Sequence, residues 1–333
     1  MTEFGMRQLG ADGPRVFPLA LGCMGMSGMY GESDDAESVR AIHAAVHGGV
    51  TLLDTGDFYG MGHNELLVGR ALAEMGEGAR DKVLLSVKFG ALRSPNGTWN
   101  GFDGRPAAVK NFLAYSLNRL GVDHIDIYRP ARLDGSVPIE ETVGAIAEMV
   151  KAGHVRHIGL SEVGLETVRR AKAVAPICDV QLEYGLASRG IEQAILPGLR
   201  ALGVGVTAYG VLSRGLLSGS TAKGKGDLRA FLPRFTGENY AKNQTLVAAL
   251  AELAAARGAS AAQMAIAWVL ARGEDIVPVM GSRKVAQVQE ALGALELRLS
   301  SEEIARLEAA VPAAEIAGSR YDKHQMAMLD SER

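Results

Sequence analysis

An aspartate, a tyrosine and a lysine are the residues of this sequence whose types and spacing could do chemistry. Asp54 and Tyr59 lie in the stretch LLDTGDFYG, and Lys88 follows in LLSVKFG. A free phenol, with a pKa of about 10, is a poor general acid at neutral pH. A nearby ammonium lowers that pKa, and a carboxylate keeps the ammonium charged and oriented. The trio could therefore donate a proton to a substrate oxygen that becomes negative, although a buried ion pair beside a half-buried tyrosine accounts for the same residues.

These residues can act together only if the fold brings them to one place. Eight short apolar stretches have the character of buried strands, and helical stretches separate them. They are residues 18–23, 50–54, 82–89, 124–128, 155–161, 177–184, 204–209 and 275–280. Such alternation predicts a parallel sheet, and eight units in 333 residues favour a closed (β/α)8 TIM barrel. A doubly wound open sheet is the alternative, but no G-x-G-x-x-G motif follows the first strand.

Several local signals complete the predicted domain, which spans residues 1–333. The helix around 36–47 ends in two glycines, Asn64 is a candidate N-cap, and Ser300 or Ser301 with Glu303 resembles a capping box. The segment GADGP predicts an N-terminal hairpin. Residues 219–240 form a long loop after the seventh strand, and loops of this length are commonly functional. The polar C-terminal tail from about residue 314 is expected to fold over one rim.

Composition excludes several classes of protein. The net charge of -3 gives no basic footprint for nucleic acid, and no apolar run is long enough to span a membrane. The N-terminus lacks the apolar stretch of a secretory signal. Cys23 and Cys178 suggest neither a disulfide framework nor a metal site. We expect a cytoplasmic protein that binds a small molecule and no metal, while its oligomeric state stays open.

In a barrel, functional residues lie at the carboxyl ends of the strands. Reading those ends in this sequence brings the trio together with polar and aromatic residues from the later strands. The additional residues are Arg129, Arg132, Ser161, Glu162, Gln181, Glu183 and Tyr209.

The sequence resembles the aldo-keto reductase superfamily from about residue 6 to residue 312, and most closely its bacterial branch of pyridoxal reductase-like enzymes. The resemblance rests on LLDTGDFYG with NELLVGRAL, LLSVKFG, VPIEETVGAIAEMVKAGHVRHIGLSE, VTAYGVLSRGLLSG and IVPVMGSRK. It implies a barrel that binds NADP(H) without a Rossmann unit and reduces aldehydes or ketones. Tyr59 then matches the proton donor, and Lys88 and Asp54 match the pair that tunes it.

The resemblance also implies a cofactor site. Ser161 and Gln181 match the residues that hold the nicotinamide carboxamide, Glu162 stands where many relatives have Asn, and Tyr209 matches the stacking ring. The remaining matches are Gly210, Val211, Leu212, Arg214 and Gly215 over the pyrophosphate, Gly281, Ser282, Arg283 and Lys284 at the 2′-phosphate, and Gln287 and Glu290 at the adenine. Arg283 suits a phosphate because its fork can donate two hydrogen bonds.

One position departs from the family. Most members end the fourth strand in Y-x-x-H, but here Ala131 follows Tyr128 at the histidine position. No other histidine is an obvious substitute, whereas Arg129 or Arg132 could supply the missing donor or bind an anionic substrate group. The expected substrate pocket consists of Met24, Tyr30, Phe58, Trp99, Tyr128, Arg129 and Ala131.

Three functions remain open at this point. The first is an active reductase whose pocket is reshaped around Ala131. The second is an NADP(H)-binding sensor or regulatory protein with vestigial activity. The third is Schiff-base chemistry at Lys88, which the neighbouring Asp54 opposes because it stabilises the charged amine.

Overall fold

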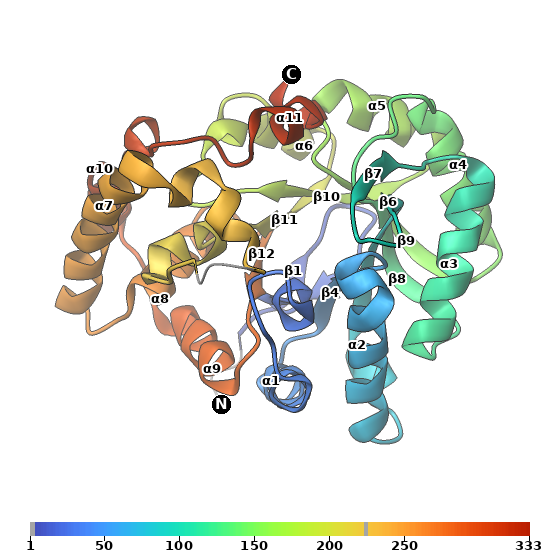
Figure 1. Cartoon of the computed structure of the whole chain (residues 1–333), viewed down its shortest axis with the longest axis horizontal. Coiled ribbons are helices and arrows are strands. Elements are labelled where there is room, and N and C mark those ends of the chain that lie inside the picture. The colour runs from blue at the N-terminus through green and yellow to red at the C-terminus, as the bar shows by residue number, and fades with distance from the viewer. Residues whose placement is uncertain (1–3, 223–225) are drawn as a thin grey trace.

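The computed structural model describes residues 4–222 and 226–333, and it shows a closed barrel of eight parallel strands (Figure 1). Each strand pairs with its neighbour in chain order, and the last strand pairs with the first. The barrel strands are β3 (Ala20–Gly22), β4 (Leu52–Gly56), β5 (Leu84–Phe89), β8 (Ile125–Pro130), β9 (Val155–Ser161), β10 (Ile177–Glu183), β11 (Gly205–Tyr209) and β12 (Ile276–Gly281). All eight overlap the predicted apolar stretches, so the barrel prediction is confirmed and the open sheet is excluded.

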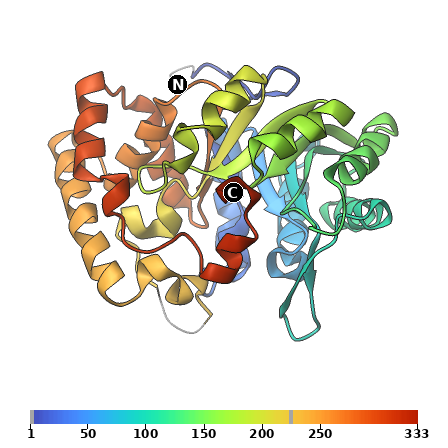
Figure 2. The same cartoon turned by 90° about the horizontal axis from the view of Figure 1, so that it is seen from above.

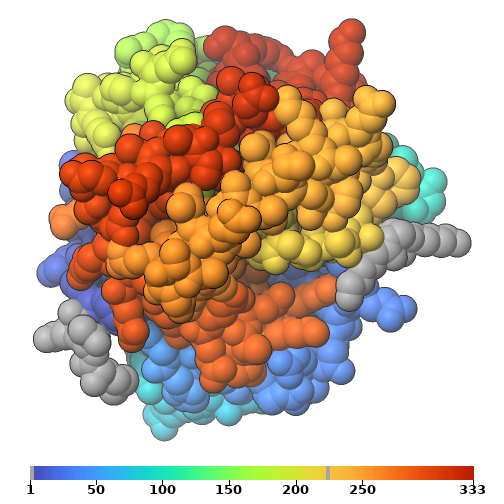
Figure 3. All heavy atoms as spheres, turned by 90° about the vertical axis from the view of Figure 1, so that its left-hand side faces the viewer, coloured from blue at the N-terminus to red at the C-terminus, as the bar shows by residue number. Residues whose placement is uncertain are grey.

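Helices surround the barrel and bury the outer faces of its strands (Figures 1 and 2). They are α1 (Asp35–His47), α2 (His63–Glu74), α3 (Pro106–Leu120), α4 (Ile139–Lys151), α5 (Leu165–Val174), α6 (Ile195–Ala201), α7 (Gly237–Ala256), α8 (Ala261–Leu270), α9 (Val285–Gly293), α10 (Ser301–Ala310) and α11 (Lys323–Ala327). Figure 3 shows the side that α7, α9 and α10 cover. Within the described ranges no single helix has both the length and the hydropathy to cross a membrane, and α7 with α8 meets that test only as a pair bent by 85°.

Within the described residues, two hairpins lie outside the barrel. The predicted N-terminal hairpin is present as the antiparallel strands β1 (Arg7–Gln8) and β2 (Arg15–Val16). A second hairpin, of β6 (Ala91–Arg93) and β7 (Trp99–Phe102), follows the third barrel strand. It places Trp99 near the barrel mouth, where the Trp99 ring meets Phe58 edge-on with the ring centres 5.6 Å apart.

The capping predictions have mixed outcomes. Ser300 caps α10 in a capping box with Glu303, as predicted. The prediction for Asn64 is wrong, because α2 begins at His63 and Asn64 lies inside its first turn. The Asn64 amide is buried and donates instead to the Cys23 carbonyl at 2.9 Å. It therefore fastens the loop after the first barrel strand to the helix after the second.

The fourth barrel strand extends two residues beyond its apolar run, through Arg129 and Pro130. Side chains alternate along a strand, so Tyr128 and Arg129 point to opposite sides. Tyr128 faces outward, stacks on Phe89 with the ring centres 4.2 Å apart, and donates to the Val109 carbonyl. Arg129 points into the barrel and is fully buried. The prediction that these two residues line a substrate pocket is therefore wrong.

The segment between the seventh strand and α7 contains short 3-10 turns, η5 (Ser213–Ser218), η6 (Leu228–Phe231) and η7 (Pro233–Phe235). The predicted loop 219–240 includes residues 223–225, which lie outside the described residues, and its last residues already belong to α7. The tail after α10, red in Figure 1, crosses the molecule and ends beside α5, where Asp330 accepts a hydrogen bond from the Gly164 N–H at 2.8 Å.

Candidate active site

Asp54 and Lys88 form a buried ion pair at the carboxyl ends of the adjacent strands β4 and β5. Lys88 Nζ contacts one oxygen of the Asp54 carboxylate. The second oxygen, Oδ2, accepts hydrogen bonds from Ser86 Oγ and Gln181 Nε2, both at 2.8 Å. Because the carboxylate is held from three directions, it fixes the ammonium on the inner wall of the barrel.

Tyr59 lies directly beyond β4, in the short turn η2 (Tyr59–Gly62). Gly60 and Gly62 adopt left-handed conformations there, with φ of 57° and 98°, which reverse the chain within one turn. The Phe58 ring packs edge-on against the tyrosine, with the ring centres 4.8 Å apart. Lys88 Nζ lies 5.3 Å from the centre of the Tyr59 ring. The structure thus brings the predicted trio together on one wall.

The electrostatics of Tyr59 differ from the sequence-based expectation. Burial raises the pKa of Tyr59 well above its ordinary value, the charge of Asp54 raises it further, and Arg132 acts in the opposite direction. The lowering that the sequence predicts from Lys88 is smaller than these influences. Burial lowers the pKa of Lys88, against the effect of Asp54. The phenol is therefore held protonated, as a proton donor must be before the substrate arrives.

A cavity of about 600 Å³ opens from this trio and extends along the barrel mouth to β12. Five of the seven residues predicted for the substrate pocket line it, namely Met24, Tyr30, Phe58, Trp99 and Ala131. The predicted cofactor residues that line it are Ser161, Gln181, Tyr209, Gly210, Val211, Leu212, Arg214, Gly215, Gly281, Ser282, Arg283, Gln287 and Glu290. Glu162 and Lys284 do not.

The end of the cavity at β12 has the chemistry that a dinucleotide phosphate requires. Arg283 Nη1 donates to the carbonyls of Tyr30 at 3.2 Å and Glu32 at 2.9 Å, and no carboxylate among the described residues lies within 4 Å of its guanidinium. The loop across the cavity takes left-handed conformations at Arg214 and Gly215, with φ of 56° and 91°. A phosphate can therefore meet an unpaired guanidinium here, so these residues fit the nicotinamide dinucleotide that the sequence predicts.

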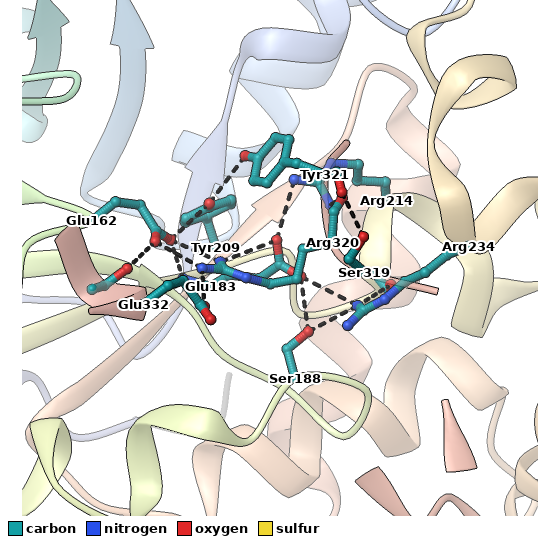
Figure 4. Close-up of polar contacts among 12 residues, drawn as sticks. Glu162, Glu183, Ser188, Tyr209, Arg214, Arg234, Ser319, Arg320, Tyr321 and Glu332 are labelled. Atoms are coloured by element: carbon teal, nitrogen blue, oxygen red, sulfur yellow. Dashed lines mark hydrogen bonds and ion pairs between the residues drawn. The ribbon is translucent and has the colours of Figure 1, made fainter. Parts of the chain in front are cut away.

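Glu162 turns away from the cavity because its backbone is left-handed, with φ of 52°. Its carboxylate accepts from Arg320 Nη1 at 3.0 Å and Nη2 at 2.9 Å, as Figure 4 shows. Burial would raise the pKa of Glu162, but Arg320 and Arg132 outweigh it and lower the pKa to about 2. Glu162 therefore binds the C-terminal tail, and the prediction that it contacts the cofactor is not supported by this position.

Lys284 is exposed at the residue before α9 and lies outside the cavity lining. Its side chain makes no ion pair with any described residue. Lys284 can therefore attract a phosphate of the cofactor only from a distance, through its charge. Arg283, in contrast, lines the cavity itself.

A directed chain of hydrogen bonds connects the tail with the cavity (Figure 4). The Glu162 carboxylate is ionised, so it accepts from the Tyr209 hydroxyl at 2.8 Å. Tyr209 has one hydroxyl hydrogen, and it must therefore accept from the Tyr321 hydroxyl at 3.1 Å. Tyr321 in turn accepts from Arg132 Nη2 at 3.3 Å. The tail thus fixes the orientation of Tyr209, the predicted stacking residue.

The tail residues at the cavity are the part of the site that sequence reasoning missed. Tyr321, His324 and Met328 all line the cavity, although the tail was predicted only to cover a rim. His324 is exposed and lines the cavity, although the sequence had offered no histidine as an obvious substitute at the Ala131 position. The one signal was SRYDKH, which places an arginine, a tyrosine and a histidine close together in a polar segment.

Comparisons with known proteins identify the family of this chain. The aldo/keto reductase family matches residues 18–312. A probable aldo-keto reductase 1 from Glycine max is 40% identical over 319 residues, covering 94% of this chain and 91% of that protein. The structure of a glycerol dehydrogenase from Gluconobacter oxydans matches with a TM-score of 0.82 and 33% identity, covering 94% of this chain and 97% of that one. An aldo-keto reductase from Bacillus halodurans in its holo form matches with a TM-score of 0.77 and 27% identity, covering 97% and 100%. The chain therefore belongs to the aldo/keto reductase family of NAD(P)-dependent oxidoreductases that act on carbonyl groups.

Proposed function

We propose that this protein reduces aldehydes or ketones to alcohols with NADPH, and that Tyr59 donates the proton. The convergence of Tyr59, Lys88 and Asp54 on the wall of one cavity carries this proposal. When bound, the reduced nicotinamide supplies the hydride to the carbonyl carbon. The phenol of Tyr59 then gives its proton to the carbonyl oxygen as negative charge develops there.

The neighbouring side chains support this step by binding and orientation. The charge of Lys88, fixed by Asp54, stabilises the phenolate that remains after proton transfer. Ser161 and Gln181 present side-chain hydrogen-bonding groups to the cavity and would hold the carboxamide. Tyr209 offers a ring whose hydroxyl is already fixed, so its face can support the nicotinamide.

Arg283 supports a preference for NADPH over NADH. Its guanidinium lines the cavity and is bonded only to neutral carbonyl oxygens. The 2′-phosphate of NADPH would give the Arg283 guanidinium a negatively charged partner, which none of the described residues provides. An adenosine ribose without that phosphate would leave the guanidinium with neutral partners only, so it would bind less tightly.

One observation favours a second candidate, an NADP(H)-binding sensor. Ala131 lines the cavity, and its methyl group can neither donate a hydrogen bond nor orient a carbonyl. The loss of one positioned donor costs on the order of 10² to 10³ in rate. This loss slows a reductase without abolishing it, and a sensor would not require the buried trio, so we favour the reductase.

Oxidation of NADPH by the purified protein tests the proposal, with NADH in parallel. The carbonyl panel includes simple aldehydes, ketones, pyridoxal, and glyceraldehyde with dihydroxyacetone, because a similar structure is a glycerol dehydrogenase. We expect turnover with NADPH, weak activity with NADH, and loss of turnover with retained NADPH binding in Tyr59→Phe. Tyr115→Phe, at an exposed position of α3, is the matched control. Full activity of Tyr59→Phe would refute the assigned donor, and tight NADPH binding without any turnover would favour the sensor.

A further inference from the structure

Arg132 is a cationic side chain at the catalytic end of the cavity, directly after Ala131. We propose that Arg132 binds an anionic group of the substrate, so that the enzyme acts on carbonyl compounds that carry a carboxylate or a phosphate. This inference rests on the reductase function proposed above and specifies its substrate class.

The guanidinium of Arg132 forms no direct ion pair with any described residue, although the Glu162 carboxylate interacts with it over a longer distance. Its guanidinium donates to the Ala131 carbonyl at 2.6 Å, to Ser161 Oγ at 3.4 Å and to the Tyr321 hydroxyl at 3.3 Å. All three acceptors are neutral, and a guanidinium has about five N–H donors to offer. Among the described residues, no carboxylate lies within 4 Å of it.

The other arginines of the cavity wall show that an unpaired charge is not the general condition here. Arg214 pairs with Glu183 at 3.2 Å, and Arg229 pairs with Asp227 at 2.6 Å. Arg320, behind the wall, pairs with Glu162 at 2.9 Å. The cavity-lining guanidiniums bonded only to neutral oxygens are therefore Arg132 and Arg283, within the parts of the chain that the structure describes.

These two guanidiniums lie at different parts of the cavity. Arg283 follows β12, at the end assigned to the cofactor phosphate. Arg132 follows β8, beside Ser161 and within the electrostatic influence that reaches Tyr59, after the larger effects of burial and Asp54. The cofactor roles proposed for the cavity place the nicotinamide, not a phosphate, at this end. A second anion site next to the proton donor is therefore available to the substrate.

The Tyr321 hydroxyl is an acceptor of Arg132 that a substrate anion could replace. It accepts from Arg132 at 3.3 Å, a long contact with a neutral group. A carboxylate or phosphate oxygen is a stronger acceptor for a guanidinium, because charge-assisted hydrogen bonds are about twice as strong as neutral ones. An anionic substrate can therefore take this place, or share the guanidinium with Tyr321, without breaking any ion pair.

Matched substrate pairs test the proposal. 4-Carboxybenzaldehyde is compared with methyl 4-formylbenzoate, and 4-formylphenyl phosphate with 4-methoxybenzaldehyde. We expect Arg132→Met to lower the ratio of kcat/KM for the charged to the neutral partner by about 10- to 100-fold, mainly through KM, because a hydrogen bond to a charged group is removed. Arg132→Lys should keep part of the preference. Arg70→Met, at an exposed position of α2 remote from the cavity, should leave the ratio unchanged.

The two pairs distinguish a carboxylate site from a phosphate site, since only the matching pair will show the large change in ratio. An unchanged ratio for both pairs in Arg132→Met would overturn the proposal. An equal fall in kcat for charged and neutral partners would also overturn it, because Arg132 would then act on the carbonyl oxygen.

Binding supplies a readout that does not depend on turnover. Calorimetry with 4-(hydroxymethyl)benzoate and its methyl ester, on the protein with and without NADP⁺, should show that only the acid binds and that Arg132→Met weakens it about 10-fold or more. If no aldehyde is reduced by the wild-type protein, the reductase function fails, while this measurement still decides whether Arg132 binds an anion. Equal binding of acid and ester would overturn the anion site.

Discussion

Arg129 and Arg132 lie three positions apart in the sequence and in opposite surroundings. Arg129 is fully buried inside the barrel, where it donates to Asp179 Oδ2 at 2.8 Å and to Thr207 Oγ1 at 3.1 Å. Arg132 lines the cavity and has only neutral partners. The strand that carries Arg129 ends at Pro130. The guanidinium of Arg129 therefore lies inside the closed barrel, whereas that of Arg132, beyond the end of the strand, lies at the barrel mouth.

The difference shows how enclosure separates a structural charge from one that can serve a ligand. A charge inside a closed barrel is removed from water, and it is tolerated only with a counter-ion and further hydrogen bonds. A charge at a cavity mouth keeps contact with solvent, so it can remain without a counter-ion until a ligand arrives. The same residue type therefore stabilises the barrel at one position and is free to bind at the other.

The largest effect is expected from Arg129→Met. Removal of this guanidinium leaves Asp179 buried without its counter-ion, and such a change costs about 3–5 kcal/mol of unfolding free energy. Chemical denaturation measures this loss, and Arg132→Met should lie within about 1 kcal/mol of the wild type in the same assay. The double variant Arg129→Met with Asp179→Leu should recover part of the loss, because no charge then remains unpaired. A small effect of Arg129→Met alone would remove the distinction between the two arginines.

The sequence was sufficient to predict the barrel and much of the site. The eight apolar stretches produced the eight strands, because strands covered by helices must be apolar along most of their length. The trio was predictable because each member ends a strand or lies in the loop directly after one. The roles of these residues in catalysis stay predictions.

Two features could not be read from local sequence. The apolar run that predicted β8 ends at Tyr128, and a charged residue gives no periodic signal, so the inward direction of Arg129 was hidden. The pairing of Glu162 with Arg320 spans 158 residues, and no local pattern connects such positions. Long-range charge pairs of this kind depend on the closed fold, which only the structure shows.

Arg320→Met tests whether the ion pairs of the C-terminal tail stabilise the protein and position Tyr209. This arginine contacts Glu162 and Glu332, at 2.9 Å and 2.6 Å. Its loss should cost about 1.5–3 kcal/mol, as expected for hydrogen bonds between charged groups. Because Tyr209 then loses a fixed partner, NADPH binding should weaken by up to about 10-fold when followed by fluorescence titration.

The exposed pair of Arg170 with Glu140 provides the control for Arg320→Met. Its contact of 2.7 Å joins two side chains that are 47% and 41% exposed. Arg170→Met should cost less than about 1 kcal/mol and should leave NADPH binding unchanged. Equal effects of the two variants would show that the tail does not position Tyr209.

Ala131→His tests whether a hydrogen-bond donor at this position of the cavity raises the reduction rate. A histidine here would add a hydrogen-bond donor beside the proton donor, at a site where a single donor is worth up to about 10³ in rate. We expect kcat for small neutral aldehydes to rise by about 10-fold, since the cavity was shaped without this ring. Initial rates with NADPH measure the change, and a fall would indicate that the alanine leaves room for a larger substrate. The preference for anionic partners, set by Arg132, should decrease as the neutral substrates improve.

Asp57 is the acidic counterpart of Arg132, because its buried carboxylate has no cationic partner within 4 Å among the described residues. Unlike an arginine, it can become neutral, and burial together with the charge of Glu65 raises its pKa to about 8. In the unfolded chain the pKa is about 3.9. Between these values only the folded protein holds the proton, so the contribution of Asp57 to stability decreases as pH rises from about 4 to about 8.

Asp57→Asn removes this dependence of stability on pH. The unfolding free energy of the variant relative to the wild type should therefore rise by up to about 1.4 kcal/mol per pH unit between pH 5 and pH 7. Denaturant titrations across that range measure it, and a constant difference would show that Asp57 is ionised in the folded protein, buried and without a direct counter-ion.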